Sequence, residues 1–184
     1  MPVFLGVGSN IRPETNIPAA LELLLGEPAL RVLAVSPFYR TDPLGSLGGD
    51  AEFVNGVLQI ATELEPRPLK RAVLRPIEAR LGRSMSRRTG ARTIDLDLVA
   101  YGDRILETPD LRLPDPDWLT RPFIATPLAA LSPEFVHPVS GQTAAAIAAA
   151  LGTAGLRLDA EITLRLQGRL GQPPAAQGGG QEMQ

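Results

Sequence analysis

The chain has no cysteine among its 184 residues and only one histidine. It can therefore form neither disulfides nor zinc–thiolate sites, and it has no thiol nucleophile. No stretch reaches the ~18 consecutive apolar residues that cross a bilayer, and the N-terminus lacks the basic and apolar segments of a signal peptide. We expect a cytoplasmic protein that does not contact membranes.

Positive charge is also scarce, because 18 basic residues face 20 acidic ones and the formal net charge is −2. Sequence-independent binding of nucleic acid usually depends on a marked positive excess, so we expect no nucleic-acid partner. The length suits one domain, predicted at residues 1–168. The tail, residues 169–184, is rich in Gly, Pro and Gln, and we expect it to be disordered.

Hydrophobic patterning predicts four strands with a helix after the first and the third. The strands are expected at 3–8, 31–40, 52–63 and 94–101, and the second helix at 66–82. Pro13 and Pro18 compete for the start of the first helix, while Pro37 predicts a bulge or edge and Pro76 a kink or early end. The order β-α-β-β-α-β predicts an α+β, ferredoxin-like fold: an antiparallel sheet with helices packed on it.

The part of the chain after residue 101 forms C-terminal additions to this unit. Prolines at 109, 114 and 116 indicate an irregular stretch. Beyond it we expect two short helices, at 123–131 and 142–151, and a strand pair within 155–166.

Two aspartates interrupt the apolar strand at 94–101. Side chains alternate along a strand, so Leu96 and Leu98 face one side while Asp95 and Asp97 face the other, with Cα atoms roughly 6–7 Å apart. A hard divalent cation would relieve the repulsion between two carboxylates at this spacing. A solvated strand face is the alternative, and for the pair alone it is the favoured one, although aspartate is disfavoured in strands.

Arginines are concentrated just before this strand, with no acidic residue among them: Arg80, Arg83, Arg87, Arg88 and Arg92. Guanidinium groups suit phosphate oxygens. A solvated cationic loop is the alternative. Beside the two aspartates, the cluster favours a metal–polyphosphate site.

Other features suggest or exclude further chemistry. Phe53 and Asn55 share a strand face, which indicates a flat ligand that is stacked and hydrogen-bonded, although Phe53 could be ordinary core. Gly6 and Gly8 follow a strand without the third glycine of a dinucleotide fingerprint. His137 has no second histidine with which to bind a metal, so we expect it to be structural.

These residues and several other motifs resemble the 6-hydroxymethyl-7,8-dihydropterin pyrophosphokinase family over roughly residues 3–140. The motifs, in chain order, are Gly8-Ser9-Asn10, Ser36-Pro-Phe-Tyr39-Arg-Thr41 with Leu44-Gly45, Phe53-Val-Asn55, Ile77-Glu78, Leu81-Gly82-Arg83, Gly90-Ala-Arg92-Thr-Ile-Asp95-Leu-Asp97-Leu, Leu113-Pro114, Arg121-Pro-Phe123 with Pro127-Leu128, and His137-Pro138. The ordered set is far more specific than any single motif.

The resemblance implies transfer of pyrophosphate from ATP to the hydroxymethyl oxygen of the pterin, leaving AMP, in folate synthesis. It implies two Mg²⁺ ions on Asp95 and Asp97, with ATP as co-substrate and a pterin alcohol as the other partner. Asp97 is also a candidate acceptor for the hydroxyl proton. We expect a monomer.

The resemblance also implies a role for each residue of the site. The expected catalytic residues are Asp97, Arg83 and Arg92; the expected pterin-binding residues are Thr41, Pro43, Leu44, Phe53, Asn55 and Phe123; the expected ATP-binding residues are Glu78, Arg83, Arg88, Arg92, Arg112 and Arg121. Phe53 and Phe123 would sandwich the pterin ring, and Asn55 would bind its edge.

One departure from the family pattern falls at Asp115, where a histidine is usual. Against a phosphate, this carboxylate must turn away, hold a cation or pair with an arginine such as Arg112. Two other interpretations stay open: a non-catalytic binding module on the same fold, and another Mg-nucleotide transferase with an Asp-x-Asp motif. A binding module would need neither the aspartate pair nor the arginines.

Overall fold

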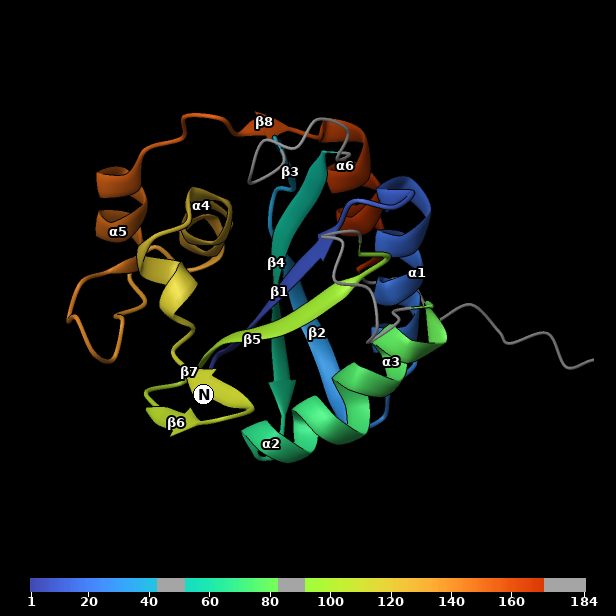
Figure 1. Cartoon of the computed structure of the whole chain (residues 1–184), viewed down its shortest axis with the longest axis horizontal. Helices are drawn as coiled ribbons and strands as arrows, with labels where there is room; N and C mark the ends of the chain where they lie inside the picture. Colours follow the sequence, from blue (N-terminus) through green and yellow to red (C-terminus); the bar gives the residue numbers. More distant parts are fainter. Residues whose placement is uncertain (43–51, 83–91, 171–184) are drawn as a thin grey trace, which may run out of the picture.

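The computed structural model describes residues 1–42, 52–82 and 92–170 (Figure 1). Its main element is a six-stranded antiparallel sheet. The strands, in spatial order, are β5 (Asp95–Tyr101), β1 (Val3–Ser9) and β4 (Phe53–Thr62). On the other side of β4, β2 (Leu30–Val35) and β3 (Tyr39–Thr41) pair with it one after the other, and β8 (Arg157–Leu158) pairs with β3. This arrangement confirms the predicted ferredoxin-like α+β fold with C-terminal additions.

The strand predicted at 31–40 is in fact two strands, separated by Ser36, Pro37 and Phe38. Pro37 has no N–H for the ladder, so pairing with β4 is interrupted there. Ser36 restores two bonds across the gap, because its N–H donates to the Val57 carbonyl and its hydroxyl accepts from the Val57 N–H. Phe38 fits over Gly56, where an added Cβ would lie 2.5 Å from the Phe38 ring.

Helices cover both faces of the sheet (Figure 1). On one face lie α1 (Pro13–Leu25), α3 (Arg75–Arg80) and α6 (Ala160–Arg169), and on the other α4 (Pro122–Leu131) and α5 (Ala144–Leu151). The larger core lies under the first group, and a smaller core around Phe4, Val57, Val99 and Trp118 lies under the second. The functional site lies on this second face.

The prolines resolve the two helix ambiguities. Pro13 begins α1, and Pro18 lies buried inside the helix. The helix predicted at 66–82 spans α2 (Pro66–Pro68), η1 (Leu69–Leu74) and α3, without a break at Pro76. The Pro76 ring lacks an N–H and would crowd the carbonyl four residues earlier, and η1 is accordingly a wide π-turn in which the Arg75 N–H bonds the Lys70 carbonyl.

The strand pair predicted within 155–166 is wrong. Only β8 is extended, and α6 begins immediately after Asp159, whose carboxylate accepts the Ile162 N–H at 3.0 Å as an N-cap. Ile162, Thr163 and Leu166 are buried at helical spacing against α1 and β2. The predicted helices at 123–131 and 142–151 are confirmed as α4 and α5.

The stretch expected to be irregular contains a small hairpin, β6 (Leu106–Thr108) and β7 (Leu111–Leu113), followed by the 3-10 turn η2 (Pro116–Leu119). The tail beyond residue 170 lies outside the described residues, so its predicted disorder stays a prediction. The predicted domain end at 168 falls in the last turn of α6. No helix of the described part has the length and apolar composition to cross a membrane.

Candidate active site

The two aspartates of β5 lie opposite two glycines of β1. Asp95 pairs with Gly8 and Asp97 with Gly6, so all four residues face the same side of the sheet. Gly8 in turn pairs with Asn55 of β4, and an added Cβ at Gly8 would lie 2.7 Å from Asn55 Oδ1. The absence of a side chain at Gly8 therefore lets the Asn55 amide approach β1 beside Asp95.

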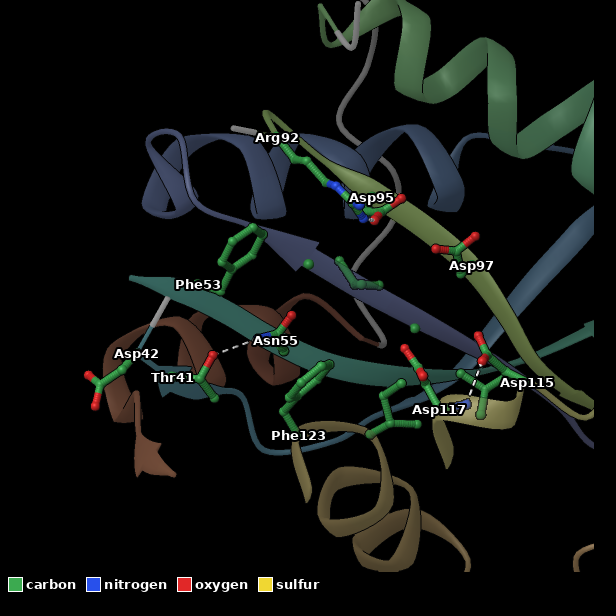
Figure 2. Close-up of a pocket in the computed structure, with 16 residues that line it drawn as sticks. Thr41, Asp42, Phe53, Asn55, Arg92, Asp95, Asp97, Asp115, Asp117 and Phe123 are labelled. Atoms are coloured by element: carbon green, nitrogen blue, oxygen red, sulfur yellow. Dashed lines mark hydrogen bonds and ion pairs between the residues drawn. The ribbon is translucent and has the colours of Figure 1, made fainter. Parts of the chain in front are cut away.

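These residues line a cavity of about 330 Å³ (Figure 2). The predicted pterin residues Thr41, Phe53, Asn55 and Phe123 all lie on its wall, and the Asn55 side-chain amide donates to the Thr41 hydroxyl at 3.3 Å. Figure 2 shows Phe53 on β4 and Phe123 at the start of α4, with Asn55 between them in the view. A flat ligand fits this combination of two aromatic side chains and one amide.

Arg92 reaches the same cavity and pairs with Asp95 through its Nη1. The end of β1 holds its backbone: the Arg92 N–H donates to Asn10 Oδ1 at 2.6 Å, and the Asn10 N–H donates to the Arg92 carbonyl at 3.1 Å. Ser9 Oγ donates to the Thr93 carbonyl at 2.6 Å. The motif after β1 thus fixes the residues leading into β5, a role that sequence reasoning missed because 82 residues separate Asn10 from Arg92.

Lys70 of η1 is a second cation at the site, and sequence reasoning did not select it. Its Nζ lies 3.5 Å from Asp97 Oδ1, and its side chain is largely buried. The sequence signal was that Lys70 is the only lysine of the chain. Each of the two aspartates of β5 therefore has a basic partner from a different segment.

Asp115 and Asp117 add negative charge to the cavity wall. Asp115 lies at the start of η2, where its Oδ1 accepts the Asp117 N–H at 2.9 Å. Burial, followed by the charges of Asp97 and Asp117, raises the pKa of Asp115 to about 6, although the Asp117 N–H and the Lys70 charge act in the opposite direction. The cavity thus carries more carboxylates than basic groups among its described lining residues, and these carboxylates would repel a polyphosphate that carried no cations.

An ion pair with Arg112 was one of the three arrangements expected for Asp115, and the two residues do not form it. Arg112 lies on the β6–β7 hairpin, where its Nη2 is 3.3 Å from Glu107 Oε1, and it does not line the cavity. Glu78, another predicted ATP residue, is buried and accepts the Leu96 N–H at 2.7 Å. Its carboxylate therefore supports β5 from the opposite face of the sheet.

Arg121 lies immediately before α4, with its Nε 3.8 Å from Oδ1 of Asp117, which lines the cavity. The remaining predicted residues, Pro43, Leu44, Arg83 and Arg88, lie outside the described residues. His137 is buried against Trp118, with ring centroids 4.6 Å apart, and its Nδ1 accepts the Val139 and Ser140 N–H groups. These contacts favour the structural role expected for His137.

The carboxylate pair suits magnesium better than zinc. No group of three or more His, Asp or Glu residues within the described ranges is arranged to hold a metal. Mg²⁺ commonly uses one or two protein carboxylates and completes its shell with phosphate oxygens and water. The fold and site together define a small α+β protein in which two neighbouring carboxylates, two aromatic side chains and one amide line a single cavity.

Comparison with known proteins identifies the family. The family model described as 7,8-dihydro-6-hydroxymethylpterin-pyrophosphokinase (HPPK) matches residues 4–133. The 2-amino-4-hydroxy-6-hydroxymethyldihydropteridine pyrophosphokinase of Pseudomonas aeruginosa is 40% identical over 137 residues, covering 74% of this chain and 83% of that protein. The protein of the same name from Methylorubrum extorquens is 39% identical over 154 residues, covering 83% and 95%. This chain belongs to the 6-hydroxymethyl-7,8-dihydropterin pyrophosphokinase family.

Solved structures agree with the fold. Wild-type HPPK-DHPS of Plasmodium falciparum with SDX-DHP superposes with a TM-score of 0.59 at 15% identity, covering 81% of this chain and 43% of that chain. The same protein with pteroate gives a TM-score of 0.61 at 14% identity, covering 81% and 42%. This chain thus spans under half the length of those two-part proteins, and at such identities the likeness supports the fold alone.

Proposed function

We propose that this chain transfers the β,γ-pyrophosphoryl group of ATP to the hydroxymethyl oxygen of 6-hydroxymethyl-7,8-dihydropterin. The hydroxyl oxygen bonds to the β-phosphorus, the bond from that phosphorus to the bridging α,β-oxygen breaks, and AMP leaves. The hydroxyl proton is transferred to a base, for which Asp97 is the candidate. The observation that carries the proposal is the shared cavity, which joins the Asp95–Asp97 pair to the Phe53–Asn55 face.

Asp95 and Asp97 are the proposed magnesium ligands, for two ions. Bound magnesium would neutralise phosphate charge and orient the transferred group. The position of both carboxylates on the cavity wall, opposite Gly6 and Gly8, supports this assignment, as does the excess of acidic side chains there. Arg92, whose backbone is held by Asn10, would release Asp95 to the metal and contribute its positive charge at the phosphates.

The pterin would lie between Phe53 and Phe123, with its polar edge at Asn55. The Asn55 carbonyl and amide can pair with neighbouring donors and acceptors on a fused heterocycle, and Thr41 holds the amide in place. Pro43 and Leu44 are proposed to contribute next to Thr41. Placing the hydroxymethyl oxygen near the β-phosphorus of ATP accounts for much of the expected rate enhancement, because the protein itself forms no covalent bond in this transfer.

ATP would enter on the side of the arginines. Arg92 and Arg121 lie on or beside the cavity, and Arg83 and Arg88 are proposed to contact the phosphates with them. For Arg112 to reach ATP, it would have to release Glu107. Glu78 is buried below Leu96, so we propose that it acts on ATP through the position of β5.

A matched pair of variants tests this assignment. Asp97→Asn should reduce turnover at least about 100-fold, because a metal ligand and candidate base is lost. Asp103→Asn, in the exposed turn that follows β5, should retain wild-type turnover. The assay is AMP release from ATP, with and without the pterin alcohol and Mg²⁺. Equal activity of both variants would contradict the proposed metal site.

The binding-module alternative predicts pterin binding without any AMP, and the alternative transferase predicts AMP or ADP only with another acceptor. We further propose that the protein acts in the cytoplasm as a monomer. Sedimentation that places the active species at the mass of a dimer would overturn the second point.

A further inference from the structure

Lys70 stands apart from the other basic residues of its helical segment. Arg67 and Arg71 turn outward and pair with Asp110, at 2.9 Å and 2.8 Å. Lys70 turns toward β5, and only 21% of its side chain is exposed, against 47% for Arg67 and 57% for Arg71. Its Nζ lies 3.5 Å from Asp97 Oδ1. The wide π-turn of η1 thus places the Lys70 ammonium beside Asp97, which the proposed function assigns as a metal ligand.

A metal ion on Asp97 would conflict with this arrangement. A divalent cation and an ammonium group that share one carboxylate repel each other across a few ångströms. The ammonium cannot simply move into water without cost, since most of the Lys70 stem is buried. A second carboxylate within reach of Lys70 would provide a new position for the charge.

Asp115 is suited to that role. It lines the same cavity as Asp97, and its backbone N–H donates to the Val99 carbonyl of β5 at 2.8 Å, two residues along the strand from Asp97. Its Oδ1 accepts the Asp117 N–H, and that contact holds the side chain against η2.

We propose that Lys70 is a positioning residue of the metal site: its ammonium holds the Asp97 carboxylate in the metal-free enzyme and shifts to Asp115 when a metal ion binds Asp97. The inference rests on the proposed function, because it requires a metal on Asp97. It adds a specific consequence, namely that Lys70 and Asp115 are energetically coupled during metal binding.

Calorimetric titration of Mg²⁺ into the full chain with α,β-methylene-ATP tests the coupling without turnover. Lys70→Met keeps the length and apolar stem of the side chain and removes a cation that competes with Mg²⁺, so binding should tighten about threefold to tenfold. Arg71→Met is the matched control: it removes the same charge one residue away, from a group paired with Asp110, and should change the Mg²⁺ affinity less than about twofold.

Asp115→Asn completes a double-mutant cycle. In the wild-type background it should weaken Mg²⁺ binding, because Lys70 is left on Asp97. In the Lys70→Met background, Asp115→Asn should reduce the Mg²⁺ affinity by a factor at least about three times smaller, because only the direct effect of the missing Asp115 charge remains. Equal losses of Mg²⁺ affinity in both backgrounds would overturn the proposal. So would a Lys70→Met variant that binds Mg²⁺ with the same affinity as Arg71→Met. A wild type that binds Mg²⁺ no better than Asp97→Asn would instead overturn the metal site itself.

Discussion

Replacing Asp115 by asparagine should stabilise the free protein at neutral and alkaline pH. Burial and nearby carboxylates raise the pKa of Asp115 to about 6 from its usual value of 3.8. The folded state therefore holds the proton more tightly than the unfolded chain does. The contribution of Asp115 to stability is fully present below pH ~4, is lost as pH rises to about 6, and stays lost above it.

The size of the effect follows from the shift. The difference of about 2.2 between the two pKa values, at about 1.36 kcal/mol per unit, gives about 3 kcal/mol. Partial exposure of Asp115 to solvent reduces this to about 1–2 kcal/mol. Asparagine keeps the N-cap, because its side-chain oxygen can still accept the Asp117 N–H. For a chain of this length the gain corresponds to a rise in Tm of about 2–8 °C at pH 8.

Urea unfolding of wild type and Asp115→Asn at several pH values from 3.5 to 8, without nucleotide or metal, measures this difference. The two proteins should be nearly equal in free energy of unfolding at pH 3.5 and diverge between pH 4 and 7. Asp103→Asn, at an exposed position, should follow wild type throughout. A difference that is constant with pH, or a variant less stable at pH 8, would refute the reasoning about burial and charge at Asp115.

Three further changes test other parts of the account. Asn55→Ala should raise the Kd for the pterin about tenfold or more and that for ATP less than about threefold, by calorimetry; the reverse ranking would overturn the assignment of the two substrates to the two parts of the cavity. Gly8→Ala places a Cβ 2.7 Å from the Asn55 amide oxygen and should likewise weaken pterin binding, whereas Gly168→Ala, with open space on α6, should not. Deleting residues 171–184 should leave turnover and Tm nearly unchanged, and a large loss in either would show that the tail is structural.

The features that could be predicted best from the sequence are those that follow from the alternation of side chains along a strand. Alternation along β5 correctly placed Asp95 and Asp97 on one face and Leu96 and Leu98 on the other, because strand side chains alternate whatever the strand pairs with. The same reasoning correctly placed Asn55 with Phe53 on the face of β4 that lines the cavity. These local rules were sufficient to place both sets of side chains on the faces that line the cavity.

Features that depend on long-range contacts could not be predicted in the same way. The hydrogen bonds between Asn10 and Arg92 and the ion pair between Lys70 and Asp97 join segments far apart in the chain, so no local spacing reveals them. The helix α6 was missed because the short segment before it is extended, and its Asp159 cap is recognisable only once the turn is known.

The ratio of AMP to ADP formed with the pterin alcohol tests the central claim most directly. Wild-type protein would be incubated with ATP, Mg²⁺ and 6-hydroxymethyl-7,8-dihydropterin, and the products separated by anion exchange and identified by ³¹P NMR. The account predicts AMP and pterin diphosphate in equal amounts, because the β,γ-pyrophosphoryl group moves as one unit. ADP with a pterin monophosphate, or AMP with free pyrophosphate and unchanged pterin, would contradict it.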